Sequence, residues 1–193
     1  MIPVYIHGAS ATPSSFNYIR KKLNHHNDIT LAYDSRNGFK ENLERMKDEL
    51  KDVHNIFFIC HSLGGIYALH LSEALPKQVL GAVTMSTPYN GAEAAEYMKH
   101  ILPFNRLFKD IGPSSCPIRK TNKIKIQHPW TNIVSTRGAS PLILSPNDGV
   151  VTIKSMMHRE DINYIEVPVN HYEVVLDDRV VDIIKSEIKK VTK

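Results

Sequence analysis

The residue with the clearest potential for chemistry is Ser62, which stands where a continuous apolar run ends and a segment of helical character begins. The run Ile56–Cys60 is typical of a strand buried on both faces. A sharp turn between strand and helix strains its central residue and requires small residues two positions before and two after it. Cys60 and Gly64 meet this requirement. The pattern predicts an exposed nucleophilic hydroxyl on Ser62, beside a helix N-terminus that stabilises negative charge.

The elements that must position this residue alternate between strands and helices. Short apolar runs predict strands at Ile2–Ile6, Ile29–Tyr33, Ile56–Cys60, Val79–Met85, Thr131–Ser135 and Tyr164–Val167. Helical character is found at Ser14–Asn24, Phe39–Lys51, Leu63–Leu75, Gly91–Ile101 and Val174–Val191. This alternation predicts an α/β fold with a mostly parallel sheet and helices on both faces. Ligands of such sheets bind beyond the carboxyl ends of the strands.

With this strand, turn and helix, Cys60-His61-Ser62-Leu63-Gly64 resembles the nucleophile elbow of the α/β-hydrolase superfamily, which usually reads G-x-S-x-G. Cys60 replaces the first glycine and is small enough for the turn. It is also an alternative nucleophile, although a thiol at the end of a buried strand is more often a packing residue. The whole chain is most similar to small lipase-type and esterase-type hydrolases with a reduced core.

The resemblance also implies an oxyanion hole, a pair of backbone N–H groups that bind the negative oxygen of a tetrahedral intermediate. Ile6-His7-Gly8-Ala9 matches the His-Gly sequence that follows the first strand in such lipases. The matching donors are the N–H groups of Ala9 and Leu63. Taken without Ser62, the same residues would indicate only a turn at Gly8 and a packing role for His7.

In the family the acid and the base follow the nucleophile along the chain. Asp148 in Asn147-Asp148-Gly149-Val150-Val151 resembles the N-D-G-x-V pattern of lipases, where the carboxylate orients the imidazole. His171 follows the last predicted strand and has a side chain type that titrates near neutrality. His158 is the alternative base, and a simple Asp-Gly turn is the alternative explanation of Asp148.

Residues 92–128 interrupt the alternation and are expected to form an insertion that acts as a cap or lid. Its apolar side chains either shield the edge of the core or cover a substrate cleft. We expect substrate contacts from Phe104, Leu107 and Phe108 of this insertion. Further contacts are expected from His7, His61 and Tyr89, the last replacing the histidine of the family's Thr-Pro-His-x-Gly sequence.

Composition limits the remaining possibilities. The chain has 193 residues, of which 42% are apolar and 23% charged, which predicts one globular domain over residues 1–193 and excludes a disordered chain. Its two cysteines exclude a disulfide scaffold and a zinc finger. No apolar run reaches the roughly 18 residues of a membrane span, and no charged leader precedes the first strand, so a cytoplasmic location is expected.

Positive charge is concentrated in residues 99–125, whose net charge is +6 against +4 for the whole chain. This favours contact with an anionic surface or an anionic group on a substrate, although a solvated face is the commoner explanation. Nucleic acid is not expected as a partner, because the aromatic pattern of single-strand binding is missing.

The resemblance as a whole implies a serine hydrolase that cleaves carboxylic esters, including lipid acyl esters, through an acyl-enzyme on Ser62. Such a reaction requires no metal and no organic cofactor. A thioesterase or an acyltransferase would use the same residues. A non-catalytic protein that binds anions or lipids on this scaffold is the alternative of a different class.

Overall fold

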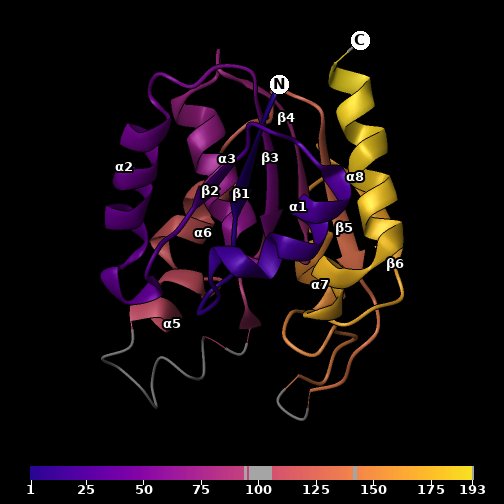
Figure 1. Cartoon of the computed structure of the whole chain (residues 1–193). Coiled ribbons are helices and arrows are strands. Elements are labelled where there is room, and N and C mark those ends of the chain that lie inside the picture. The colour runs from indigo at the N-terminus through magenta and orange to yellow at the C-terminus, as the bar shows by residue number, and fades with distance from the viewer. Residues whose placement is uncertain (94, 96–105, 141–142, 193) are drawn as a thin grey trace.

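The structure is a computed structural model that describes residues 1–93, 95, 106–140 and 143–192 (Figure 1). Its centre is a six-stranded sheet in the order β2-β1-β3-β4-β5-β6, and every neighbouring pair is parallel. The strands are β1 (Ile2–Ile6), β2 (Ile29–Leu31), β3 (Ile56–His61), β4 (Val79–Met85), β5 (Trp130–Ser135) and β6 (Asn163–Val167). The predicted parallel sheet is confirmed.

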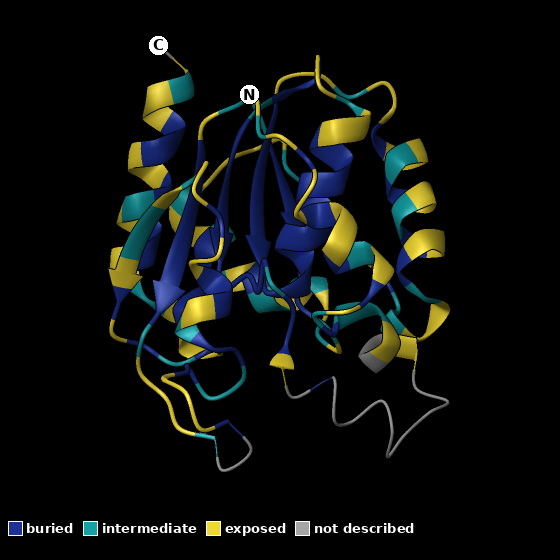
Figure 2. Cartoon of the chain, turned by 180° about the vertical axis from the view of Figure 1, so that it is seen from behind, coloured by how far each residue is buried: buried dark blue, intermediate teal, exposed yellow. Residues whose placement is uncertain are grey.

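The strand β3 is apolar from Ile56 to Cys60 because both faces of the sheet are covered. Along β3, Phe58 and Cys60 belong to one core cluster, whereas Phe57 and Ile59 belong to a second cluster on the opposite face. Burial of the whole strand explains why its sequence shows a continuous apolar run rather than alternation. Figure 2 shows the buried strands between helices whose outer sides are exposed.

Helices cover the two faces unequally. The first core cluster contains side chains of α2 (Phe39–Leu50), α3 (Leu63–Ala74) and α6 (Cys116–Thr121). The second contains side chains of α1 (Asn17–Leu23) and α8 (Asp178–Val191). α3 is buried along most of its length because α2 and α6 pack on it, whereas α8 has one apolar stripe against the sheet.

Several boundaries differ from the sequence expectations. The predicted helix Ser14–Asn24 is split into a 3-10 turn, η1 (Pro13–Phe16), and α1. The predicted C-terminal helix is likewise divided into η3 (Glu173–Leu176) and α8, because the side chain of Asp177 accepts a hydrogen bond from the N–H of Arg179 and starts a new helix. The strand expected at Ile29–Tyr33 ends at Leu31.

Most of the helix predicted at Gly91–Ile101 lies outside the described residues. The described part of 92–128 includes the short helices α5 (Arg106–Ile111) and α6. α5 lies against η2 (Ser35–Asn37), and the carboxylate of Asp110 accepts a hydrogen bond from the N–H of Phe39 at the start of α2. The insertion is therefore attached to the helical layer at this end of α2.

α7 (Ile153–Met156) follows the loop that contains Asp148. In the part of the chain that the structure describes, no helix is long and apolar enough to cross a membrane.

Candidate active site

The turn after β3 has the strained geometry expected of a nucleophile elbow. Ser62 has φ 51° and ψ −122°, a conformation that residues with a side chain rarely adopt. Its N–H donates to the carbonyl of Met85, and the hydroxyl of Thr87 donates to its carbonyl. These hydrogen bonds to the neighbouring strand end hold the turn in place.

Gly64 allows α3 to begin directly against the end of β1. A Cβ atom at this position would lie 2.1 Å from the carbonyl oxygen of Ile6. The next residue, Gly65, also leaves no space for a side chain, because a Cβ atom there would lie 2.1 Å from Oγ1 of Thr87. The double glycine is therefore a requirement of helix packing at the elbow.

Cys60 lies on β3 with its side chain in the core and no exposed surface. Burial raises the pKa of its thiol well above the usual value, so the thiol is protonated near neutrality. It does not line the pocket at Ser62. The alternative in which Cys60 is the nucleophile has no geometric support.

The loop after β1 approaches the elbow from the side of Gly8. A Cβ on Gly8 would lie 3.2 Å from Cβ of Ser62, so the two segments pack closely. The N–H groups of Ala9 and Leu63 donate to no acceptor within the described residues, and both residues line the same pocket as Ser62. Two unpaired donors therefore lie beside the serine.

His7 holds the backbone of this loop. Its Nδ1–H donates to the carbonyl of Gly8 at 2.8 Å, its Nε2 accepts from the N–H of Tyr33, and its ring stacks on Tyr33 at 4.3 Å. The hydroxyl of Tyr33 donates to the carbonyl of His7. His7 was expected to contact substrate, but it is 1% exposed and outside the lining of the pocket, because these interactions turn its ring into the protein.

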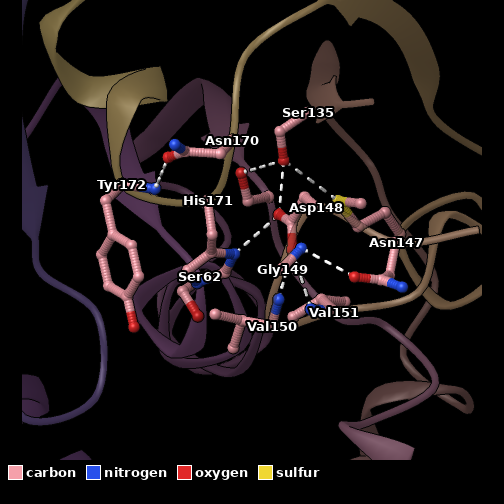
Figure 3. A network of polar contacts seen from close by, with 12 residues as sticks. Ser62, Ser135, Asn147, Asp148, Gly149, Val150, Val151, Asn170, His171 and Tyr172 are labelled. Carbon is pink, nitrogen blue, oxygen red and sulfur yellow. Dashed lines mark hydrogen bonds and ion pairs between the residues drawn. The ribbon is translucent and has the colours of Figure 1, made fainter. Parts of the chain in front are cut away.

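Asp148 and His171 meet across the carboxyl edge of the sheet (Figure 3). Nδ1–H of His171 donates to Oδ2 of Asp148 at 2.7 Å, and the N–H of His171 donates to the carbonyl of Asp148. The side chains are 3% and 0% exposed. His171 also lines the pocket that contains Ser62, whereas the alternative base His158 is exposed and does not line it.

The carboxylate of Asp148 is held by four donors. Oδ1 accepts from the N–H groups of Val150 and Val151, and Oδ2 accepts from His171 and from the hydroxyl of Ser135 at 2.5 Å. Burial acts to raise the pKa of Asp148, but the hydrogen bond and charge of His171 and the hydrogen bonds from Ser135 and Val151 outweigh it. The pKa of Asp148 is therefore lowered, and the carboxylate is ionised near neutrality.

The segment that carries His171 is organised by its neighbours. Oδ1 of Asn170 accepts from the N–H groups of Tyr172 and Glu173, and the carboxylate of Glu173 accepts from the N–H of Asn170. This reciprocal arrangement resembles a capping box at the start of η3. It fixes the backbone on which the imidazole is mounted.

His61 was expected to bind substrate, and its side chain contacts the segment that carries His171. Its Nε2–H donates to the carbonyl of His171 at 2.9 Å, and the two rings lie 4.8 Å apart. Burial and the nearby His171 lower the pKa of His61 to about 3, so the ring is neutral. It lines the pocket of Ser62 and is 6% exposed.

The pocket has a volume of about 270 Å³ and is mainly apolar. Its apolar lining residues outside the elbow and the first loop are Pro88, Ala92, Ile111, Val150, Val151 and Val175. The expected contact from Tyr89 is not found there, because this side chain is fully buried and its hydroxyl bonds to Thr84 and Trp130. Phe104 lies outside the described residues, and of Leu107 and Phe108 only the backbone, in α5, is described.

Sequence reasoning missed Ser135 and Ser86. Ser86 has φ 51°, follows the end of β4, and its hydroxyl lies 2.6 Å from that of Ser135 at the end of β5. The two hydroxyls form a buried line that leads to Asp148. Their position at the carboxyl ends of neighbouring strands was the available signal.

No protein-family model matches this chain, and no curated protein is similar to it in sequence. Solved structures are similar in fold. A lipase of Bacillus licheniformis superposes with a TM-score of 0.69 at 12% sequence identity. The superposition covers 95% of this chain and 90% of the lipase chain. A metagenomic carboxyl esterase superposes with a TM-score of 0.75 at 14% sequence identity. The superposition covers 90% of this chain and 65% of the esterase chain.

An extracellular α/β-hydrolase of a Paenibacillus species superposes with a TM-score of 0.63 at 14% sequence identity. The superposition covers 99% of this chain and 98% of that hydrolase chain. Identities this low establish a common fold rather than a common activity. The parallel sheet, the elbow after β3 and these superpositions together show that the chain has the α/β-hydrolase fold.

Proposed function

We propose that the protein is a serine hydrolase that cleaves carboxylic esters. The observation that carries the proposal is the shared pocket of Ser62 and His171, in which the imidazole is hydrogen-bonded on its far side to the ionised Asp148. This is the order of nucleophile, base and orienting carboxylate that acyl transfer requires. The solved structures of similar fold include a lipase and a carboxyl esterase, which supports the same class of substrate.

In this mechanism Nε2 of His171 accepts the proton of the Ser62 hydroxyl as the oxygen attacks the acyl carbonyl. Within the described residues the Ser62 hydroxyl has no side-chain hydrogen bond, and catalytic hydrogen bonds often tighten only when substrate is bound. His171 then returns the proton to the leaving alcohol. Asp148 stabilises the imidazolium that exists between these steps.

The negative oxygen of the tetrahedral intermediate is assigned to the N–H groups of Ala9 and Leu63. Both donors are unpaired in the described part of the molecule, and both residues line the pocket of Ser62. Fixed backbone donors of this kind each contribute about 100-fold or more to the rate. Water then attacks the acyl-enzyme by the same proton transfers and releases the acid.

The proposal is tested with short p-nitrophenyl esters. Ser62→Ala is expected to lower kcat by at least about 1,000-fold, because the acyl-enzyme can no longer form. Cys60→Ser is the matched control, since it replaces the other nucleophilic side chain of the elbow and should retain hydrolysis. Loss of activity in the control with full activity in Ser62→Ala would reassign the nucleophile to Cys60.

The size of the pocket favours short acyl chains. A volume of about 270 Å³ bounded by alanine, valine and isoleucine side chains accommodates a small apolar group. Acetate and butyrate esters are therefore expected to be better substrates than long-chain esters. A thioesterase with the same residues would turn over matched sulfur esters faster than oxygen esters, and this comparison separates the two activities.

The chemistry proposed here uses no metal or organic cofactor. Among the described residues there is no group of three histidine, cysteine, aspartate or glutamate side chains that could hold a metal ion. Dialysis against EDTA is expected to leave ester hydrolysis unchanged.

The contact of residues 99–125 with an anionic surface is a separate proposal. It is tested by sedimentation of the protein with vesicles that contain or lack an anionic lipid.

A further inference from the structure

His61 lies where three parts of the site meet. It is the residue directly before Ser62, and its side chain reaches across to the segment that carries His171. On the opposite side, its Nδ1 lies against the loop after β1, since a Cβ on Gly8 would be only 2.9 Å from this atom. The ring therefore contacts both the segment that carries His171 and the loop that carries Ala9. Its backbone belongs to the elbow.

We propose that His61 is a positioning residue that sets the distance between nucleophile and base through its hydrogen bond to the backbone of His171. The proposal rests on the function assigned to Ser62 above. The bond joins residues 110 positions apart in the sequence and has a length of 2.9 Å. Because residue 61 is covalently attached to Ser62, this single contact links the backbones of the two groups that exchange a proton.

A neutral imidazole suits this position for two reasons. The carbonyl of His171 can only accept, so Nε2 of His61 must carry the proton, and its tautomer is fixed. A neutral ring also adds no positive charge beside His171 when that residue becomes an imidazolium during the reaction. The titratable groups that act on His61 are His171 and Asp148 on the side of the base and His7 on the side of β1.

The contact also holds the ring of His61 in one orientation. Its ring packs at 4.8 Å from the ring of His171 and at 53° to it, and 6% of the residue is exposed. In this proposal His61 acts on the reaction through the position of His171. A loss of alignment of about 1 Å between reacting groups can lower a rate by about 100-fold.

The test compares three variants. His61→Phe keeps a planar ring without a donor, and His61→Gln supplies an amide N–H that can reach an acceptor at a similar distance. The matched control is His70→Phe, which replaces another buried histidine, on α3, whose Nε2 contacts Thr121 and Pro117 away from this pocket. Each variant is checked by thermal unfolding and assayed with a short p-nitrophenyl ester.

His61→Phe is expected to lower kcat by about 10-fold to 100-fold while KM stays near the wild-type value. His61→Gln is expected to recover a large part of kcat, and the control is expected to keep kcat even if its melting temperature falls. Wild-type kcat in a folded His61→Phe, or equal losses in His61→Phe and His61→Gln, would overturn the proposal. An inactive wild-type enzyme would instead contradict the proposed function.

A measurement on the wild-type protein covers the case in which His61→Phe does not fold. Nitrogen NMR of labelled histidine should show the ring of residue 61 protonated on Nε2 and unchanged between about pH 5 and 9. A ring that titrates near its ordinary value, or that is protonated on Nδ1, cannot make the proposed bond and would overturn the assignment.

Discussion

At the scale of single residues, Asp148 depends on the donors around it. A buried carboxylate is ionised only where hydrogen bonds and opposite charge offset its loss of hydration. Two backbone N–H groups, the hydroxyl of Ser135 and the imidazole of His171 supply these interactions. The same contacts that stabilise the charge also fix the direction of the carboxylate, so ionisation and orientation have one cause.

Asp148→Asn is expected to lower kcat by about 10,000-fold with little change in KM, because the amide favours the wrong tautomer of His171. Steady-state kinetics on a short ester measure this effect. Asp178→Asn, at an exposed carboxylate on α8 that pairs with Lys22, is the control and should retain activity. A kcat within about tenfold of wild type in Asp148→Asn would show that the carboxylate does not orient the base.

Ser135→Ala is expected to raise the pKa of Asp148, because one donor to Oδ2 is removed. A carboxylate whose folded pKa is lowered stabilises the protein above its unfolded pKa, and this contribution is lost as the pH falls through the folded value. The variant should therefore lose about 1.5–3 kcal/mol at neutral pH. Its acid unfolding should begin at a higher pH, as followed by urea denaturation at several pH values. Wild-type stability throughout would mean that the hydroxyl contributes no net free energy.

At the scale of elements, the site depends on how closely α3 approaches the end of β1. Gly64 and Gly65 leave no space for a side chain, and Leu63, the residue before them, lines the pocket of Ser62. The elbow, the loop after β1 and the segment of His171 lie at one edge because parallel strands end on the same side.

Gly64→Ala is expected to destabilise the protein by at least about 3 kcal/mol and to abolish hydrolysis, because the new methyl group would overlap the backbone of Ile6. Ala74→Ser, at the exposed C-terminal end of the same helix, is the control and should change stability by less than about 0.5 kcal/mol. Chemical denaturation and ester hydrolysis measure both effects. An active, stable Gly64→Ala protein would mean that helix and strand are further apart.

At the scale of the whole molecule, buried neutral histidines couple stability to pH. Burial lowers the pKa of His61 to about 3, and burial with the nearby Lys120 lowers that of His70 to about 4, from an ordinary value of 6.5. The unfolded chain therefore binds protons that the folded chain does not bind. By linkage, stability is fully present above about pH 6.5 and falls as the pH decreases toward these values.

The melting temperature is expected to fall from pH 7 to about pH 5, and to fall less in His70→Gln, which removes one of the titrating groups. Lys120 and Glu73 act on His70 with opposite sign and remain in the variant. Differential scanning calorimetry at matched ionic strength measures the effect. Identical pH dependence in both proteins would mean that His70 is not a source of the acid sensitivity.

The sheet was predictable because strands such as β3 are buried on both faces and therefore appear in the sequence as short, mainly apolar runs. The strained turn at Ser62 was predictable because a strand, small residues and a helix surround it. The contacts of His61 and Ser135 were not predictable, since they depend on which strands are neighbours and on side-chain directions at strained turns. Tyr89 was assigned to the pocket from its motif, but its hydroxyl is used by Thr84 and Trp130 inside the core.

The most direct test of the proposed mechanism is the site of reaction with a fluorophosphonate, which forms a stable adduct only with an activated nucleophile. Peptide mass spectrometry is expected to locate the adduct on Ser62, and labelling is expected to be strongly slowed in His171→Ala. An adduct on Cys60, or labelling of Ser62 at the wild-type rate without the imidazole of His171, would contradict it.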